Sequence, residues 1–342
     1  MFKIGIVGCG YWGPNLIRNF IRIPDTKVAC CDMSKERLQE MKTLFYDIEI
    51  FTDYEKLLAS DIDAVAIATP VASHYELAKK AILADKHVLI EKPLTRTSEE
   101  ALDLIKLAES KKTTLMVDHT FEYVPSVKKI RDIVKEGQLG NIYTLNTSRV
   151  NLGLFQKDVN VLLDLAPHDI SMLRYILDQS PISVRAFAMS FIRPDIQDTA
   201  YLFLKFRNNV MAHLHLSWLS PRKIRELTII GGKKMLVYDD VNPNEKIKIY
   251  DKGVSVQKNE LPPTKYYGSY EEFQFFYRSG DIFVPKVDNV EPLKEVCKHF
   301  IECVNTGKKP LTDGYSGYNV VKVIDAAQES LQKNGEEIPI PN

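Results

Sequence analysis

The first 120 residues alternate short apolar runs with amphipathic segments. The apolar runs are rich in β-branched residues and predict buried strands at 3–8, 27–32, 63–69, 87–93 and 113–118. The amphipathic segments predict helices at 13–23, 34–45, 74–85 and 98–112, and Ser34 and Ser98 are the expected N-caps of two of them. Strands that are apolar throughout and joined through helices are typical of a parallel sheet covered on both faces. The pattern therefore predicts an α/β domain of the Rossmann type over residues 1–120.

The periodicity changes after Pro125. A helix at 126–140 precedes segments that alternate apolar and polar residues, at 141–151, 183–192, 199–207, 210–219, 225–240 and 245–253. Further helices are expected at 164–177, 292–305 and 316–333. Residues 121–342 are therefore predicted to form an α+β domain with an open, mainly antiparallel sheet. Tyr266, Tyr267 and Tyr270 are expected at an interface or in the core.

Length and charge narrow the class of protein. The 342 residues suit two domains, and 45 basic residues balance 45 acidic ones. This balance predicts neither nucleic acid nor a membrane surface as a partner. The five cysteines form no C-x-x-C pair, and their odd number argues against a disulfide framework. The apolar start is typical of a strand rather than a signal peptide, so we expect a cytoplasmic protein.

Three glycines, Gly8, Gly10 and Gly13, lie where the first predicted strand turns into the first helix. This Gly-x-Gly-x-x-Gly spacing is that of a dinucleotide-binding turn. Gly8 permits the tight turn, Gly10 lets a pyrophosphate approach the backbone, and Gly13 lets helix and strand pack closely. The phosphates would then meet the free N–H groups of the helix N-terminus.

An acidic residue at the end of the second strand supports this interpretation. Asp32 follows Gly13 by 19 residues, where a carboxylate that binds the adenosine ribose is expected. It would accept both ribose hydroxyls and repel a 2′-phosphate, which favours NAD over NADP. Arg37 lies five residues further on and could serve a 2′-phosphate instead.

Two constellations carry candidate catalytic groups. Glu91-Lys92-Pro93 ends a predicted parallel strand, at the sheet edge where ligands bind, and Lys92 could point toward the nicotinamide or be a solvated loop lysine. Asp164 and His168 lie four residues apart on one face of a predicted helix. His168 could remove a proton from an alcohol, with Asp164 orienting the imidazole or sharing the hydroxyl. The alternative is a capping aspartate beside a buried histidine.

A metal site is not expected. His213 and His215 alternate on a predicted strand and would face the same side. A metal would need a third ligand, and no acidic cluster lies near them in the sequence.

The glycine turn, "ATPVASH" (68–74), "EKP" (91–93) and the D-x-x-x-H of "DLAPHDIS" together resemble the Gfo/Idh/MocA oxidoreductases. The resemblance covers essentially the whole chain. It implies that NAD(P) binds in the first domain and that a sugar, cyclitol or nucleotide-sugar binds over the open sheet. It places the catalytic lysine on Lys92 and the catalytic aspartate and histidine on Asp164 and His168. It also implies a homodimer or homotetramer formed through the exposed sheet face, which needs some cover.

Within the family, "SRVNLGLFQKDVNVLLDLAPHDISML", "SWLSPRKIRELTIIG" and "GGKKMLVYDD" resemble the branch associated with nucleotide-sugar gene clusters. This implies a substrate of the UDP-N-acetylglucosamine 3-dehydrogenase type, or a related ketosugar reductase. The expected substrate contacts are Arg149, Asn151, Gln156 and His168. The expected cofactor contacts are Gly8, Gly10, Tyr11, Trp12, Gly13, Asp32, Arg37, Thr69, Pro70, His74, Glu91 and Lys92.

The expected reaction transfers a hydride between a nicotinamide and a secondary alcohol. His168 removes the hydroxyl proton while Lys92 stabilises the developing alkoxide, and the sequence leaves the direction open. Two alternatives stand beside it. The substrate could be a free cyclitol such as inositol, or the chain could be a non-catalytic NAD-binding sensor. Loss of Lys92 or His168 would be typical of a sensor, and both are present.

Overall fold

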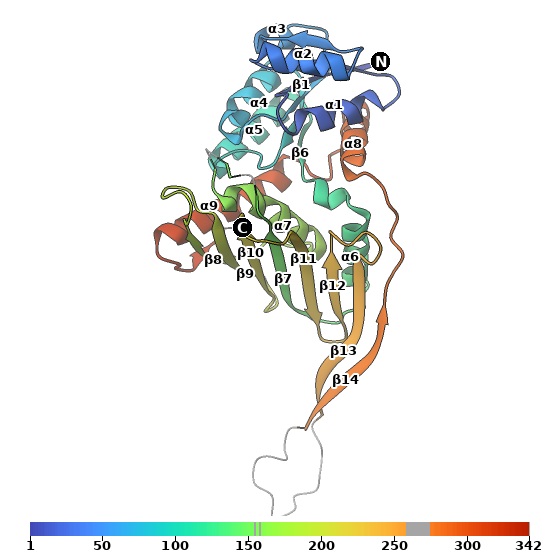
Figure 1. Ribbon diagram of the computed structural model, residues 1–342, viewed down its shortest axis with the longest axis vertical. Coiled ribbons are helices and arrows are strands. Elements are labelled where there is room, and N and C mark those ends of the chain that lie inside the picture. The colour runs from blue at the N-terminus through green and yellow to red at the C-terminus, as the bar shows by residue number, and fades with distance from the viewer. Residues whose placement is uncertain (154, 157–158, 258–273, 342) are drawn as a thin grey trace, which may run out of the picture. The chain divides into compact units, whose positions relative to one another are not determined.

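The computed structural model describes residues 1–153, 155–156, 159–257 and 274–341 (Figure 1). The chain forms two compact units, one made of Met1–Pro125, Leu162–Met172 and Asn289–Glu329, the other of Ser126–Val161, Leu173–Asp288 and Ser330–Asn342. The expected domain boundary after residue 120 lies close to the end of the first segment, but the first unit also includes the two later segments 162–172 and 289–329. Tyr266, Tyr267 and Tyr270 lie outside the described residues.

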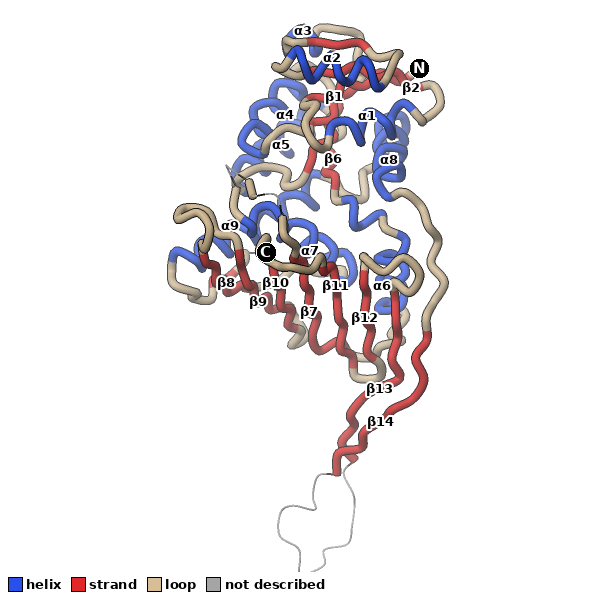
Figure 2. The backbone as a smooth tube through the Cα atoms, viewed as in Figure 1, coloured by secondary structure: helices blue, strands red, loops and turns tan. Residues whose placement is uncertain are grey.

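A six-stranded sheet forms the centre of the first unit (Figure 2). Its order is β3 (Glu49–Phe51), β2 (Thr26–Cys31), β1 (Phe2–Val7), β4 (Ala64–Ile67), β5 (His87–Glu91) and β6 (Leu115–Asp118). All neighbouring pairs are parallel. The strand order reverses between β1 and β4, which is where doubly wound sheets bind a dinucleotide. The predicted Rossmann fold is confirmed.

Helices cover both faces of this sheet, as the unbroken apolar strands require. One core packs the sheet against α1 (Gly13–Ile21), α2 (Lys35–Leu44) and α8 (Pro292–Thr306). The other packs it against α3 (Tyr54–Leu58), α4 (His74–Leu83), α5 (Ser98–Lys111) and α9 (Gly314–Gln332). Short 3₁₀ turns at Val71–Ser73 and Thr120–Tyr123 follow β4 and β6. Thus α8 and α9, which come last in the chain, complete the first unit.

The second unit is built on a nine-stranded sheet. Its order is β14 (Gln274–Phe283), β13 (Ile247–Gln257), β12 (Met235–Asp239), β11 (Ile224–Gly231), β7 (Ile142–Val150), β10 (Met211–Ser217), β9 (Thr199–Lys205), β8 (Ser183–Met189) and β15 (Ile338–Pro339). Among the described strands of this second sheet, only the β7–β10 pair is parallel. The predicted, mainly antiparallel sheet is confirmed.

Helices α6 (Pro125–Lys135) and α7 (Val161–Leu177) lie partly in the second unit, and the last residues of α9 also belong to it. Side chains alternate on its strands, since Leu202 and Leu204 are buried while Tyr201 and Phe203 are exposed. One face of this sheet therefore belongs to a core and the other is open.

Several boundaries differ from the prediction. The N-cap of α5 is Thr97, whose hydroxyl accepts the N–H of Glu100, and Ser98 is the first helical residue. The helix expected to reach residue 140 ends at Lys135, since Gly137 takes a positive φ of 67° that an α-helix cannot contain. The segment 225–240 forms two strands joined by a turn. Strands β3, β14 and β15 and helix α3 were not expected, because each is short or lacks a clear alternation.

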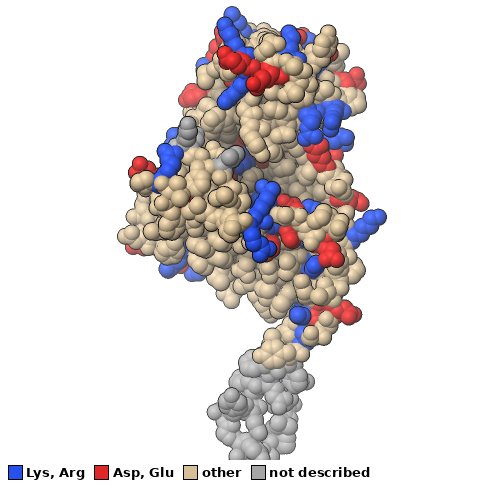
Figure 3. Space-filling model, in the orientation of Figure 1, with Lys and Arg blue, Asp and Glu red and all other residues tan. Residues whose placement is uncertain are grey.

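Acidic and basic side chains are mixed on the face shown in Figure 3, in line with the zero net charge. Among the described residues, no helix combines the length and the apolar character that crossing a membrane requires.

Candidate active site

The glycine turn joins the carboxyl end of β1, a central strand of the first sheet, to α1. Gly8 has a φ of 95°, and a Cβ there would lie 2.8 Å from the carbonyl oxygen of Ala68. A Cβ on Gly13 would lie 2.2 Å from the carbonyl oxygen of Gly8. Both residues must therefore be glycine for the fold itself.

Gly10 is glycine for a different reason. A Cβ at this position would meet only the Nη1 atom of Arg37, at 4.0 Å, which is ordinary contact. Nothing in the described part of the chain forbids a side chain at Gly10, so packing within the fold does not explain a glycine at this position. This open cradle fits the pyrophosphate of a dinucleotide.

The N-terminus of α1 is suited to an anion. Its N-cap residue is Trp12, and no side chain among the described residues caps the helix or places a carboxylate in its first turn. Pro14 occupies the first turn, where its missing N–H group has no partner to lose. The free N–H groups and the helix dipole can therefore hold phosphate oxygens.

Asp32 ties the glycine turn to the end of β2. Its Oδ2 accepts the N–H of Cys9 at 2.7 Å, and its Oδ1 accepts the N–H of Ser34 at 2.8 Å. The Nη1 atom of Arg37 lies 3.9 Å from Oδ2, and the Arg37 side chain is 56% exposed. The carboxylate expected to bind the ribose and the cation that could bind a 2′-phosphate thus lie side by side.

Lys92 and Asp164 meet within the first unit, although 72 residues separate them. The Nζ of Lys92 donates to the backbone oxygen of Asp164 at 2.8 Å and to its carboxylate Oδ1 at 3.2 Å. Lys92 follows the last residue of β5, and Asp164 lies in the first turn of α7. The two side chains are 18% and 24% exposed, so they are shielded from water yet open to a ligand.

His168 lies one helical turn after Asp164 on α7, within the part of the helix that belongs to the first unit. Its ring packs edge-on against Phe121, with ring centroids 5.3 Å apart. This contact limits the rotation of the imidazole. The structure thus places an ammonium and a carboxylate in contact, with a histidine one helical turn beyond the carboxylate on the same helix.

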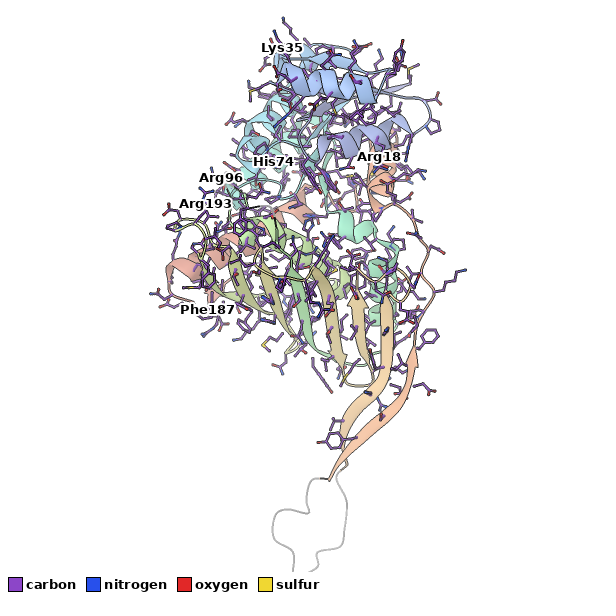
Figure 4. The ribbon with its side chains drawn as sticks, in the orientation of Figure 1. Arg18, Lys35, His74, Arg96, Phe187 and Arg193 are labelled. Atoms are coloured by element: carbon purple, nitrogen blue, oxygen red, sulfur yellow. The ribbon has the colours of Figure 1, made fainter. Side chains whose placement is uncertain are left out.

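His74 has a supporting position rather than an open one. Its ring is 1% exposed, with Nδ1 2.9 Å from the carbonyl oxygen of Pro93 and Nε2 2.9 Å from that of Thr69. Burial lowers its pKa, against the opposing effect of these two carbonyl groups. His74, labelled in Figure 4, therefore clamps the loops after β4 and β5. As a predicted cofactor contact it would act through those loops.

The remaining predicted cofactor residues differ in exposure. Tyr11 is 84% exposed, and its ring stacks on that of Trp12, which packs partly against the core. Thr69 accepts a hydrogen bond from the Ser73 hydroxyl at 2.7 Å, and Pro70 precedes the 3₁₀ turn after β4. These side chains surround the same strand ends as the glycine turn.

One residue near this site was missed from the sequence. Asp118, the last residue of β6, pairs in register with Glu91 of β5. It is 1% exposed, and burial raises its pKa. The available signal was a carboxylate at the carboxyl end of a predicted strand, next to the strand that ends at Glu91.

Three of the predicted substrate residues, Arg149, Asn151 and Gln156, belong to the second unit, whereas His168 belongs to the first. Arg149 is 5% exposed on β7, and the N–H of Asn151 donates to the oxygen of Ser217 at 3.1 Å. The carbonyl oxygen of Gln156 accepts from Arg193 at 3.3 Å. Their role in binding a substrate remains a proposal.

His213 and His215 pack against aromatic side chains. The His215 ring stacks on Tyr201 at 4.6 Å between centroids, and the His213 ring lies 5.0 Å from Phe203. Across the described ranges of the chain, no three His, Cys, Asp or Glu side chains are grouped as metal ligands.

Two family models match the chain. Residues 2–119 match an oxidoreductase family with an NAD-binding Rossmann fold, and residues 127–237 match the GFO/IDH/MocA C-terminal domain. The chain belongs to the Gfo/Idh/MocA oxidoreductase family. It is therefore an oxidoreductase with an NAD-binding first domain, as the glycine turn predicts.

Similar members of the family act on sugars and cyclitols, according to their names. The chain is 27% identical over 254 residues to a UDP-N-acetylglucosamine 3-dehydrogenase of Acidithiobacillus ferrooxidans, covering 73% of this chain and 77% of that protein. It is 24% identical to a myo-inositol 2-dehydrogenase of Thermotoga maritima, covering 97% of this chain and 96% of the other.

Solved structures share the fold of this chain. The structure of the Acidithiobacillus enzyme matches with a TM-score of 0.78 at 22% identity, covering 97% of each chain. That of GenD2 from gentamicin A biosynthesis, in complex with NAD, matches with a TM-score of 0.82 at 19% identity. The match covers 100% of this chain and 97% of that one.

Proposed function

We propose that this protein is a cytoplasmic, NAD-dependent dehydrogenase that acts on a secondary alcohol of a sugar, most specifically of a nucleotide-sugar. The observation that carries the proposal is the contact of Lys92 with Asp164, one helical turn before His168. An imidazole can accept the proton of an alcohol, and an ammonium group can stabilise the negative charge that develops on its oxygen.

Bound NAD would supply the acceptor for the hydride that leaves the carbinol carbon. The backbone at Gly10 and the N-terminus of α1 would hold its pyrophosphate, and Asp32 its adenosine ribose. His168 takes the hydroxyl proton, so that the C–O bond becomes a carbonyl as the hydride departs. Lys92 donates to the alcohol oxygen while negative charge develops there, and Asp164 holds the ammonium in place. The same donors can serve the reverse reduction.

Two substitutions test these roles. Lys92→Met and His168→Ala should each lower kcat by about 100-fold or more, while the Kd for NAD, measured by calorimetry, stays within about threefold. Lys79→Met is a matched control, because Lys79 lies on α4 and pairs with Asp103 at the surface. Full activity in either test variant would refute the assignment.

The nucleotide-sugar is supported by the named relative and by the sequence segments that resemble that branch. The inositol alternative is favoured by a relative whose match covers nearly the whole chain. Thermal shift with NAD plus UDP-N-acetylglucosamine, or NAD plus myo-inositol, decides between them, since a ligand of the folded state raises its stability. Arg149, Asn151 and Gln156 are the proposed substrate contacts. A shift with NAD alone would reject both substrates but keep the cofactor.

We also propose that the open sheet of the second unit forms a homodimer or homotetramer. Its face over β8 to β10 exposes large apolar side chains, namely Phe187 (50%), Met189 (60%), Tyr201 (39%), Phe203 (38%) and Met211 (45%). Phe187 on β8 is labelled in Figure 4, and Figure 3 shows mostly uncharged atoms over these strands. Light scattering of Phe203→Glu against the wild type tests this, and an unchanged molar mass would refute it.

A further inference from the structure

Two carboxyl groups lie together beneath the end of β5. Glu91 and Asp118 are partners in the register of the parallel strands β5 and β6, and their side chains are within hydrogen-bonding reach of each other. Oε1 of Glu91 and Oδ2 of Asp118 are both buried, and neither receives a donor from the described residues. Two buried acceptors without a donor are costly, unless a proton lies between them.

The surroundings favour one proton on this pair. Burial, followed by the charge of Asp118, raises the pKa of Glu91 well above its ordinary value. Asp118 also has a raised pKa, but its Oδ1 accepts the Thr120 hydroxyl at 2.7 Å. Asp118 is therefore the better anion, and Glu91 the better proton donor.

The other titratable groups that face the pair do not replace this proton. Lys92 favours the ionised forms by its charge, but its Nζ donates to Asp164. Cys297 of α8 faces both carboxyl groups, which raise its pKa together with burial, so it stays a neutral thiol. Burial raises the pKa of Tyr123, and the charge of Asp118 adds to this effect.

We propose that Glu91 and Asp118 form a singly protonated carboxylic acid–carboxylate pair that positions Lys92. Glu91 immediately precedes Lys92, so the hydrogen bond across β5 and β6 fixes the point from which the lysine reaches Asp164. The functional importance of this positioning rests on the proposed catalytic role of Lys92, whereas the existence of the acid pair does not depend on that role.

Thermal melting of the cofactor-free protein tests the proton. Glu91→Gln places an amide donor where the proton lies, so it keeps the hydrogen bond but cannot ionise. The wild type loses stability as pH rises above the ordinary carboxyl pKa, because its folded state holds a proton that the unfolded state releases. The Tm of Glu91→Gln minus that of the wild type should therefore rise by about 2 °C per pH unit between about pH 5 and pH 8.

Asp118→Asn should give the same slope, because its amide can donate to Glu91, and it serves if Glu91→Gln does not fold. Glu76→Gln, at an exposed position on α4, is the matched control and should show no slope. A Tm difference that stays constant with pH in both test variants would overturn the acid pair.

A second measurement tests the positioning without requiring enzymatic activity. Amine acetylation followed by mass spectrometry reports how firmly Lys92 is held, with Lys86 as an internal reference, since its Nζ donates to the oxygens of Ser60 and Ile62. Glu91→Ala should accelerate labelling of Lys92 several-fold relative to Lys86, while Glu91→Gln should leave it unchanged. Equal labelling in wild type and Glu91→Ala would overturn the positioning role. Neither experiment depends on the substrate, so a failure of the proposed function remains distinguishable.

Discussion

The substitution Gly10→Ala separates the demands of the fold from those of the ligand. The structure leaves room for the new methyl group, whose nearest neighbour would be the Arg37 side chain at 4.0 Å. Gly10 is not among the glycines with a positive φ. Alanine at such a position reduces the freedom of the unfolded chain, so we expect unfolding to cost the same or up to about 1 kcal/mol more.

Binding of NAD should respond in the opposite direction. A methyl group placed where a pyrophosphate meets the backbone is an overpacking change, with a typical cost of about 1–3 kcal/mol. That cost corresponds to a Kd for NAD raised by roughly 5-fold to 150-fold. Isothermal titration calorimetry measures the Kd, and urea unfolding measures the free energy of unfolding of the same preparation.

Gly13→Ala, in the same glycine turn, is the matched control. Its Cβ would lie 2.2 Å from the Gly8 carbonyl oxygen, so backbone must move and the free energy of unfolding should fall by about 1–3 kcal/mol. If Gly10→Ala bound NAD as tightly as the wild type, the pyrophosphate would not pass over Gly10. If Gly10→Ala lost as much free energy of unfolding as Gly13→Ala, the inference that the fold has room for a methyl group at Gly10 would be wrong.

Three further substitutions address neighbouring contacts. Asp32→Asn should weaken NAD binding about tenfold and reduce the preference for NAD over NADP, because the Arg37 guanidinium then lacks its carboxylate neighbour. Competitive titration with both cofactors checks this. His74→Gln should be less stable than the wild type above about pH 6.5, and the difference in Tm should shrink toward about pH 5. The reason is that the pKa of His74 is lowered in the folded state, so the wild type loses stability when the histidine of the unfolded chain takes up a proton. A Tm difference that stayed constant with pH would contradict this. Thr312→Val removes a buried hydroxyl that donates to the oxygen of Val117 at 2.6 Å, so urea unfolding should show a loss of about 1–3 kcal/mol, and a loss below experimental error would count against that bond.

Features set by neighbours in the sequence were predictable. The apolar runs and the residues between them predict the parallel sheet, because strand and helix periodicities are local properties of the chain. The glycine spacing predicts the turn for the same reason, since Gly8, Gly10 and Gly13 lie within six residues. The N-cap of α5 shows the limit of such patterns, because Thr97 and Ser98 are chemically similar and only the backbone conformation chose between them.

Contacts between distant residues needed the tertiary structure. Lys92 and Asp164 are each visible as candidates, but only packing brings them to 2.8 Å across 72 residues. The pairing of Glu91 with Asp118 follows from β6 lying next to β5, and strand order is not encoded in the periodicity of either strand.

The return of α8 to the first unit is likewise a matter of packing. Its apolar face could cover any sheet of matching shape, and Phe300 is fully buried against Phe2 of β1, at 6.5 Å between ring centroids. The sequence by itself thus determined the local elements and the candidate chemistry of this protein. The tertiary structure decided which of those groups meet, because long-range contacts depend on the sum of many weak packing preferences rather than on any local pattern.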